Sequence, residues 1–193
     1  MKAYSIIIQP SDSDFQSMSR KELKEQFNWY LSQIPQRTEI LAEAIHSTTG
    51  YDEWNPYFSP ESLIPLGQWF AERVETRKLT EEEKARICST TPDRLKSFVG
   101  EDELTDRTIS LAIDIGMYMA QVFLRNVPSL KWKLQLGSKR NFDYGQPVLE
   151  GFGNKVCFNP TRMIVTLAWG LENRKRDGGG LRELYDIWRK NAE

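Results

Sequence analysis

Histidine and cysteine, the side chains on which much enzyme chemistry depends, are scarce in this sequence. His46 is the only histidine, and the two cysteines, Cys88 and Cys157, lie far apart in the chain. Serine and cysteine hydrolases activate their nucleophile with a histidine that a third group orients, so His46 would have to be that base. His46 falls near the end of a predicted helix, where the helix dipole stabilises a cationic imidazole. This position favours a structural role for His46.

Metal and nucleotide sites have characteristic spacings, and we find none of them complete. Zinc sites combine several Cys and His ligands at close spacing, which one histidine and two distant thiols do not provide. Gly151-Phe152-Gly153 begins like a dinucleotide fingerprint, but Val156 stands in place of the third glycine. Residues 153–155 also lack the Ser or Thr that follows the lysine of a phosphate loop. We therefore predict no metal site and no cofactor, and we identify no catalytic residue.

Carboxylates are the remaining candidates for chemistry, and Asp114 is the most conspicuous because its neighbours are apolar. On a helical wheel it belongs to a polar stripe made of Arg107, Ser110, Asp114, Gln121 and Arg125. This placement predicts a solvated or ion-paired Asp114 close to Arg107 or Ser110. Acids that are distant in sequence can meet in a fold, so an enzyme that uses carboxylates and an arginine such as Arg162 is an alternative.

Aromatic residues stand outside the apolar stripes of their predicted helices. Trp29 lies among glutamates and a glutamine, and Trp69 lies off the apolar face of its own helix. A loop at 47–60 adds Trp54 and Tyr57. Such residues either pack under a neighbouring segment or contact a partner, because Trp and Tyr dominate binding hot spots. We take Trp29, Trp54, Tyr57 and Trp69 as candidate partner-binding residues.

Composition limits the class of protein and its partners. The chain has 193 residues, 39% of them hydrophobic, and a formal net charge of −1. This length and balance predict a single domain over 1–193 with its own core. Unpaired cysteines and the absence of a signal-like or membrane-spanning apolar run predict a cytoplasmic protein with no membrane contact. Basic runs at 139–140, 174–176 and 189–190 suit solvated helix ends better than a nucleic-acid site, given the near-neutral total. The sequence does not indicate an oligomeric state.

Periodicity and capping signals predict the elements that must position these residues. Capping boxes at Ser19-x-x-Glu22 and Thr80-x-x-Glu83 begin two helices, and Pro35 is expected to end or bend the first. The predicted helices cover 19–34, 38–46, 60–77, 80–88, 105–125, 160–171 and 181–188, with one or two helical turns at 91–98 and a flexible glycine-rich break at 173–180. The predicted strands cover 4–8, 131–136, 148–152 and 155–158, the last two joined by a hairpin turn at Gly153-Asn154. We predict an α+β fold of six or seven helices around a small, mainly antiparallel sheet.

Four stretches of the sequence are similar to known proteins: the run from Asp114 to Tyr118, the pair Lys131-Trp132, the segment 144–152 and the pair Asn159-Pro160. They resemble a group of uncharacterised bacterial proteins, some of which are presumed immunity partners of secreted toxins. The resemblance covers the C-terminal half of the chain and implies a bacterial, cytoplasmic protein that binds another protein. Our functional hypothesis is accordingly a non-enzymatic interaction protein that neutralises a toxin, with carboxylate–arginine catalysis and weak nucleic-acid binding as the alternatives.

Overall fold

The computed structural model describes residues 4–8, 14–91, 93, 96 and 99–192. Within them the chain forms six α-helices and two short antiparallel sheets of two strands each. The helices are α1 (Arg20–His46), α2 (Leu63–Ala71), α3 (Glu81–Thr90), α4 (Asp106–Asn126), α5 (Pro160–Glu172) and α6 (Gly180–Arg189). The strands are β1 (Thr76–Lys78), β2 (Asp102–Leu104), β3 (Lys131–Leu134) and β4 (Pro147–Glu150), and 3-10 turns cover Pro60–Ser62 and Gly153–Lys155. The prediction of an α+β fold with six or seven helices is confirmed.

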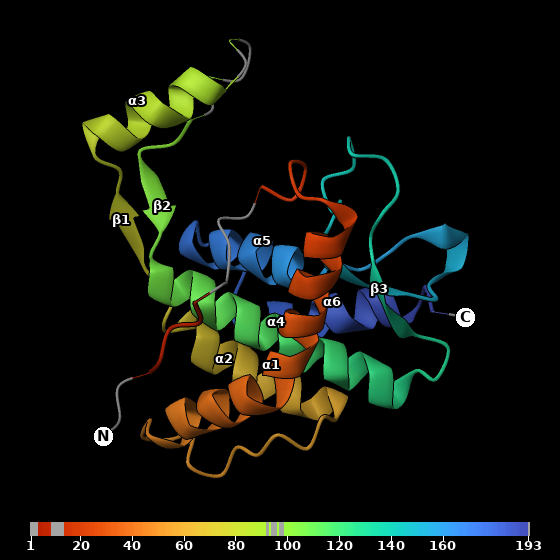
Figure 1. Ribbon diagram of the computed structural model, residues 1–193. Coiled ribbons are helices and arrows are strands. Elements are labelled where there is room, and N and C mark those ends of the chain that lie inside the picture. The colour runs from red at the N-terminus through yellow and green to blue at the C-terminus, as the bar shows by residue number, and fades with distance from the viewer. Residues whose placement is uncertain (1–3, 9–13, 92, 94–95, 97–98, 193) are drawn as a thin grey trace.

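Helix α4 is the centre of the molecule, with α1, α2, α5 and α6 arranged around it (Figure 1). Every residue from Ser110 to Ala120 is buried, so α4 meets protein on all sides. A helix that is apolar over most of its circumference belongs in the core, as its sequence predicts. Gly116 lets the start of α5 approach closely, because a Cβ atom there would lie 3.0 Å from the Pro160 carbonyl carbon.

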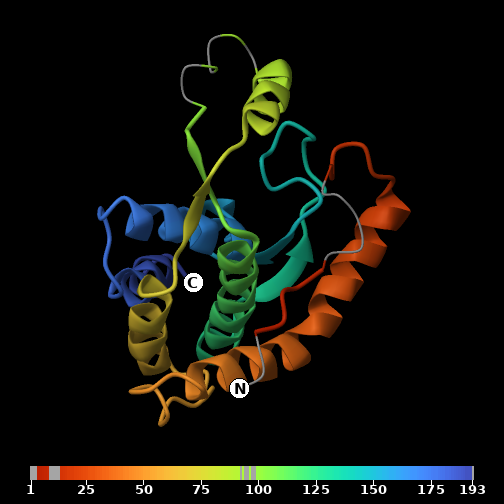
Figure 2. The same ribbon diagram turned by 90° about the vertical axis from the view of Figure 1, so that its left-hand side faces the viewer.

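Helix α1 is continuous through Pro35, so the prediction of two helices at 19–34 and 38–46 is wrong. The Ser19 and Glu22 capping box begins the helix as predicted. Pro35 removes one backbone N–H, but its ring is exposed, and the carbonyl four residues earlier can be satisfied by water on that side. Figure 2 shows α1 curving along one side of α4.

Two strand predictions are confirmed and two are wrong. Strands β3 and β4 fall inside the predicted 131–136 and close to 148–152, and they pair with Lys131 opposite Glu150. Residues 4–8 are extended but pair with no strand of the described chain. In 155–158 only Phe158 forms a β-bridge, with Leu149. The two-residue hairpin is replaced by a wider turn whose positive φ angles fall at Gly151, Asn154 and Lys155 rather than at Gly153.

A projecting arm is made of β1, α3 and β2, and the sequence predicted its helix but neither of its strands. The predicted helix 60–77 ends at Ala71, and 76–78 become a strand that pairs with 102–104. Helix α3 begins at the predicted capping box of Thr80 and Glu83. Figures 1 and 2 show β1, α3 and β2 standing away from the bundle. The predicted helical turns at 91–98 lie largely outside the described residues.

The glycine-rich turn before α6 serves close packing rather than flexibility. A Cβ atom on Gly67 of α2 would lie 2.1 Å from the carbonyl oxygen of Gly178, and one on Gly178 would lie 2.6 Å from the Gln68 Cα. Both positions therefore exclude larger residues, and the two missing side chains allow the turn to rest directly on α2. The predicted flexible break is a tightly packed contact.

Candidate functional site

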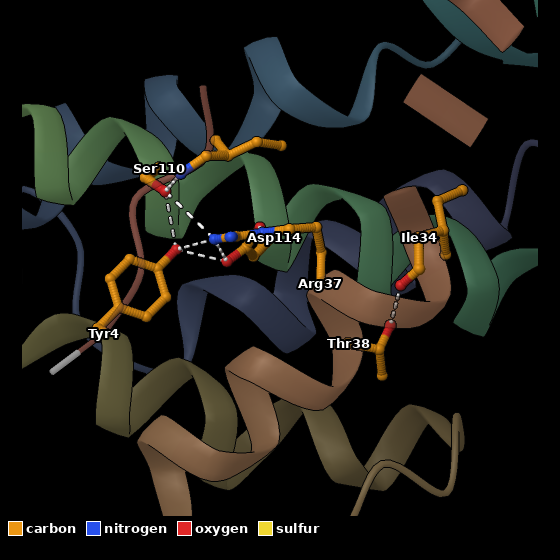
Figure 3. A network of polar contacts seen from close by, with 7 residues as sticks. Tyr4, Ile34, Arg37, Thr38, Ser110 and Asp114 are labelled. Carbon is orange, nitrogen blue, oxygen red and sulfur yellow. Dashed lines mark hydrogen bonds and ion pairs between the residues drawn. The ribbon is translucent and has the colours of Figure 1, made fainter. Parts of the chain in front are cut away.

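The densest polar cluster of the core joins the N-terminal segment to α1 and α4 (Figure 3). The Arg37 guanidinium binds both carboxylate oxygens of Asp114, with Nε–Oδ1 and Nη2–Oδ2 distances of 2.7 Å. The same Nη2 donates to the Tyr4 hydroxyl at 2.9 Å, and Tyr4 donates to Asp114. The Ser110 hydroxyl lies 2.9 Å from that of Tyr4. A buried ion pair with charge-assisted hydrogen bonds on both partners results.

The proton arrangement in this network follows from the donor count. Tyr4 has one hydroxyl proton, which it gives to Asp114, so the Ser110 hydroxyl donates to Tyr4. Ser110 in turn accepts from the Ile7 backbone N–H at 2.8 Å. The side chains of Arg37 and Asp114 are 5% and 0% exposed. Burial raises the pKa of the Asp114 carboxyl, and the Arg37 guanidinium opposes that rise.

This geometry suits a structural tie better than a reaction centre. Among the described residues, no buried side-chain nitrogen or oxygen is left without a hydrogen-bond partner. The tie holds residues 4–8 against the α1–α4 pair. The prediction that Asp114 is ion-paired and lies near Ser110 is therefore correct. Its cation is Arg37 rather than Arg107, however, and the carboxylate is buried rather than solvated.

Sequence reasoning missed Arg37 because it divided α1 at Pro35. In the undivided helix the buried positions recur every three or four residues, apart from the adjacent pair Arg37 and Thr38: Leu23, Gln26, Tyr30, Ile34, Arg37, Thr38, Leu41 and Ile45. Arg37 thus falls on the core face, where a charge requires a counterion. That spacing was a signal in the sequence, and it was lost with the helix register.

An acid and Arg162 do meet in the fold, as the enzyme alternative required. Arg162 Nε and Nη2 bind the two carboxylate oxygens of Asp143 at 2.7 and 2.9 Å. The Asn159 side chain donates to the same carboxylate at 2.8 Å and caps α5 through its other atom. Hydrogen bonding to Asp143 raises the pKa of Arg162, which keeps it charged. These contacts fix the start of α5 against the loop before β4, which is again a structural task.

The four candidate aromatic residues occupy different environments. Trp54 and Trp69 are 5% and 1% exposed, and both belong to the main core. Their indole N–H groups donate to the Ser62 carbonyl and the Thr48 hydroxyl, each at 3.0 Å. Neither therefore presents surface to a partner in this structure.

Trp29 is half-buried against a second, smaller core cluster between α1 and α4. Tyr57, by contrast, is 73% exposed. Its neighbour Phe58 adopts a φ of 56°, which is uncommon for a residue with a side chain. The Phe58 ring stacks on Tyr118 while the chain turns Tyr57 outward. Of the four candidates, Tyr57 is the one that the fold displays.

His46 and the cysteines have no arrangement suited to nucleophilic catalysis. The His46 Nε2 contacts the Trp54 carbonyl oxygen, which ties the loop after α1 to the helix end. Cys157 is unpaired, and burial raises the pKa of its thiol, which disfavours the reactive thiolate. Within the described part of the chain, no group of three or more His, Cys, Asp or Glu residues is placed to hold a metal ion.

The basic runs do not form one surface. Lys139 donates to the Gln16 carbonyl at 2.7 Å and lies over the Tyr144 ring, so it serves an internal contact. Residues 174–176 and 189–190 flank α6, whose ten residues separate them by about 15 Å at 1.5 Å per residue. Nucleic-acid binding gains no support from this placement.

Three hollows are lined by described residues. One of about 440 Å³ lies beside the 50–54 loop, one of about 490 Å³ lies beside Lys131, Lys133 and Cys157, and one of about 280 Å³ lies between α5 and α6. Neither the Arg37–Asp114 pair nor the Arg162–Asp143 pair lines any of the three. The α5–α6 hollow has the most apolar lining, with Met163, Leu167, Leu184 and Ile187.

Comparison of the chain with family models, with curated proteins and with solved structures found no match. The resemblance to presumed immunity proteins therefore stays a prediction. Among the helices described here, none has the length and apolar character needed to cross a bilayer.

Proposed function

We propose that this chain is a non-enzymatic, cytoplasmic, bacterial interaction protein that contacts another protein through its arm. The observation that carries the proposal is the arm itself, which extends α3 away from the bundle on two paired strands (Figure 2). A segment that adds little to its own core and extends into solvent increases the surface available to a partner. The exposed Tyr57 is a second, separate surface on the bundle.

Ion pairs across the arm support this function because they hold it in one shape. Arg77 binds the Glu83 carboxylate at 2.7 and 2.9 Å and also pairs with Glu103 on the opposite strand. Lys78 pairs with Asp102 at 3.0 Å. Exposed pairs contribute little singly, but several in one network restrict the ribbon together. A stiff arm loses less conformational entropy when it binds.

The base of the arm is joined firmly to α4. The Thr108 hydroxyl accepts from the Glu75 N–H at 2.9 Å and donates to the Glu75 carbonyl at 3.1 Å. The Thr105 N–H also donates to that carbonyl at 3.0 Å. Because Thr105 and Thr108 begin α4, the direction of the arm is set by the central helix.

The test compares the whole protein with a variant that lacks the arm. Thr76 and Leu104 are partners in the β1–β2 ladder, so an Asn-Gly turn can replace 77–103 and keep the base of the ribbon. Both proteins are tagged and recovered from the native host, and each preparation is analysed for a second protein that co-purifies in a near-equal molar amount to the tagged chain. We expect a partner with the whole chain and none with the armless variant, while circular dichroism shows the bundle intact in both.

Tyr57→Ala is the comparison variant, because it removes the exposed aromatic side chain of the separate surface on the bundle and leaves the arm unchanged. It should leave capture unchanged. Capture by the armless variant, or loss of capture in Tyr57→Ala alone, would contradict the proposed contact. Neutralisation of a toxin is the specific form of this function that we propose, and co-expression of the chain with the captured protein should relieve growth arrest if that protein is toxic.

A further inference from the structure

The hollow between α5 and α6 forms a short apolar groove with a polar rim. Its apolar residues come from both helices, and its rim carries Thr166, Lys175, Arg176 and Glu183. Leu167 forms the buried floor, whereas Ile187 is 49% exposed on the wall. An isoleucine exposed to this extent beside other apolar side chains is a surface that gains free energy from being covered.

Two glycines allow close packing at the end of this groove. Gly170 and Gly180 lie where α5 and α6 approach each other through the connecting turn. A Cβ atom on Gly180 would lie 2.9 Å from the Leu167 Cδ1, and one on Gly170 would lie 2.8 Å from the Arg176 Cγ. The missing side chains therefore let Leu167 and Arg176 pack directly against the backbone of α5 and α6 at this end of the groove.

The turn at the end of α5 places a free cation at one end of the groove. The backbone N–H groups of Lys175 and Arg176 both donate to the Gly170 carbonyl, at 2.9 and 3.0 Å, which fixes the turn. Arg176 is neutralised by Glu183 at 2.7 Å. Lys175 has no ion-pair partner among the described residues. The groove is thus apolar along its length and positive at the end nearest the turn.

The dimensions favour a helix as the occupant. From Met163 to Gly170 the groove follows seven residues of α5, which is about 10 Å at 1.5 Å per residue. Two turns of a second helix have the same length and present three apolar side chains at i, i+3 or i+4, and i+7. The volume of about 280 Å³ lies just below the usual range of small-molecule sites, about 300–1,000 Å³.

We propose that the α5–α6 groove binds an amphipathic α-helix of another protein, with an acidic residue beside its apolar stripe. Three apolar side chains of that helix cover Met163, Leu184 and Ile187, and the acidic residue pairs with Lys175. This surface is distinct from the arm, so the inference does not rest on the arm contact.

The experiment uses a designed probe, because the natural partner is not identified. The probe is a fluorescein-labelled, end-capped synthetic helix with Leu at i, i+4 and i+7 and Glu beside them. Its comparison peptide carries Lys in place of each Glu. Binding to the full chain is measured by fluorescence anisotropy, and amide chemical shifts in ¹⁵N spectra locate the contact.

The variant pair Ile187→Glu and Ile64→Glu provides the decisive contrast. Ile64 lies on α2 and is 47% exposed, so it matches Ile187 in residue type, helical setting and exposure. We expect Ile187→Glu to weaken binding of the acidic probe at least about tenfold and Ile64→Glu to change it less than about twofold. Lys175→Glu should weaken it about threefold, and the Lys-containing probe should bind more weakly than the Glu-containing probe.

Several results would overturn the proposal. These are no saturable binding of the acidic probe up to about 1 mM, equal binding of the two probes, equal losses in the two isoleucine variants, or amide shifts centred elsewhere than α5 and α6. Thermal unfolding of each variant, compared with the parent protein, excludes loss of fold as the cause of weakened binding.

Discussion

Replacing Asp114 by asparagine would leave the Arg37 guanidinium buried without its counterion while changing the shape of the side chain little. The two side chains are 0% and 5% exposed, so water does not replace the lost partner. Breaking such a buried pair costs about 3–5 kcal/mol, against about 0–1 kcal/mol for an exposed pair. Since domains are stable by about 5–15 kcal/mol, Asp114→Asn should remove a large share of the free energy of unfolding.

A double-mutant cycle makes this prediction specific to the pair. Arg37→Met should cost a similar amount because it leaves the Asp114 carboxylate with Tyr4 and no cation. In the double variant neither charge is present, so its cost should fall short of the sum of the single costs by about 2 kcal/mol or more. Urea unfolding followed by tryptophan fluorescence gives each free energy by linear extrapolation.

Arg162→Met is the matched control because it also breaks a two-point arginine–aspartate contact. The Arg162 side chain is 43% exposed, and Asp143 keeps the Asn159 amide as a donor. Its cost should be less than half that of Asp114→Asn. Costs below about 1 kcal/mol for both Asp114→Asn and Arg37→Met would refute the reasoning, since that is the value of a solvated pair.

Three further predictions concern the N-terminal segment, the contact between Gly67 and Gly178, and the arm. Tyr4→Phe should lower the free energy of unfolding by about 1–2 kcal/mol, because it removes one donor from the buried Asp114 carboxylate. The same substitution should accelerate amide exchange in residues 5–8 more than in α5. Gly67→Ala should lower the free energy of unfolding, measured with urea, by about 1–3 kcal/mol, since the new Cβ would lie 2.1 Å from a carbonyl oxygen. Gly137→Ala is the control and should not lower it, because the space around Gly137 is open. Hydrogen bonding to the arginine of β1 lowers the pKa of Glu83 from 4.5 to about 2, so its contribution is present above pH 4.5 and disappears as the pH falls through 2. Amide protection in α3, corrected for intrinsic rates, should therefore decrease between pH about 5 and pH about 2, and unchanged protection would contradict the ion-pair account.

The helix starts were predictable because their signals are local. The capping boxes at Ser19 and Thr80, the Thr105 cap and the Asn159 cap before Pro160 all begin helices in the structure. Each cap joins groups within three residues of each other, so the sequence contains the whole interaction. The prediction of a helix break at Pro35 fails, although it also rests on a local preference. Packing of the turns on both sides of Pro35 against α4 keeps α1 continuous.

The strands of the arm and the packing partners of the tryptophans were not predicted, for a different reason. Strands β1 and β2 have three residues each, most of them charged, and no apolar alternation, and of the two strands Leu104 of β2 reaches the core. Trp54 lies in a loop and Trp69 lies off the predicted apolar face of its helix, yet both are buried in the main core. Burial of a residue off the main stripe depends on which other segment arrives there, and periodicity within one segment does not encode this.

The amino-acid sequence by itself determined the class of fold, the starts of most helices, the central place of α4 and the positions of β3 and β4 in the chain. These depend on interactions between residues that are close in the chain or on the periodicity of one element. Only the tertiary structure decided that Arg37 neutralises Asp114 across 77 positions, that Gly67 faces Gly178, and that α5 and α6 enclose a groove. Such contacts arise from the mutual packing of separate helices, so no single segment of the sequence contains the information that specifies them.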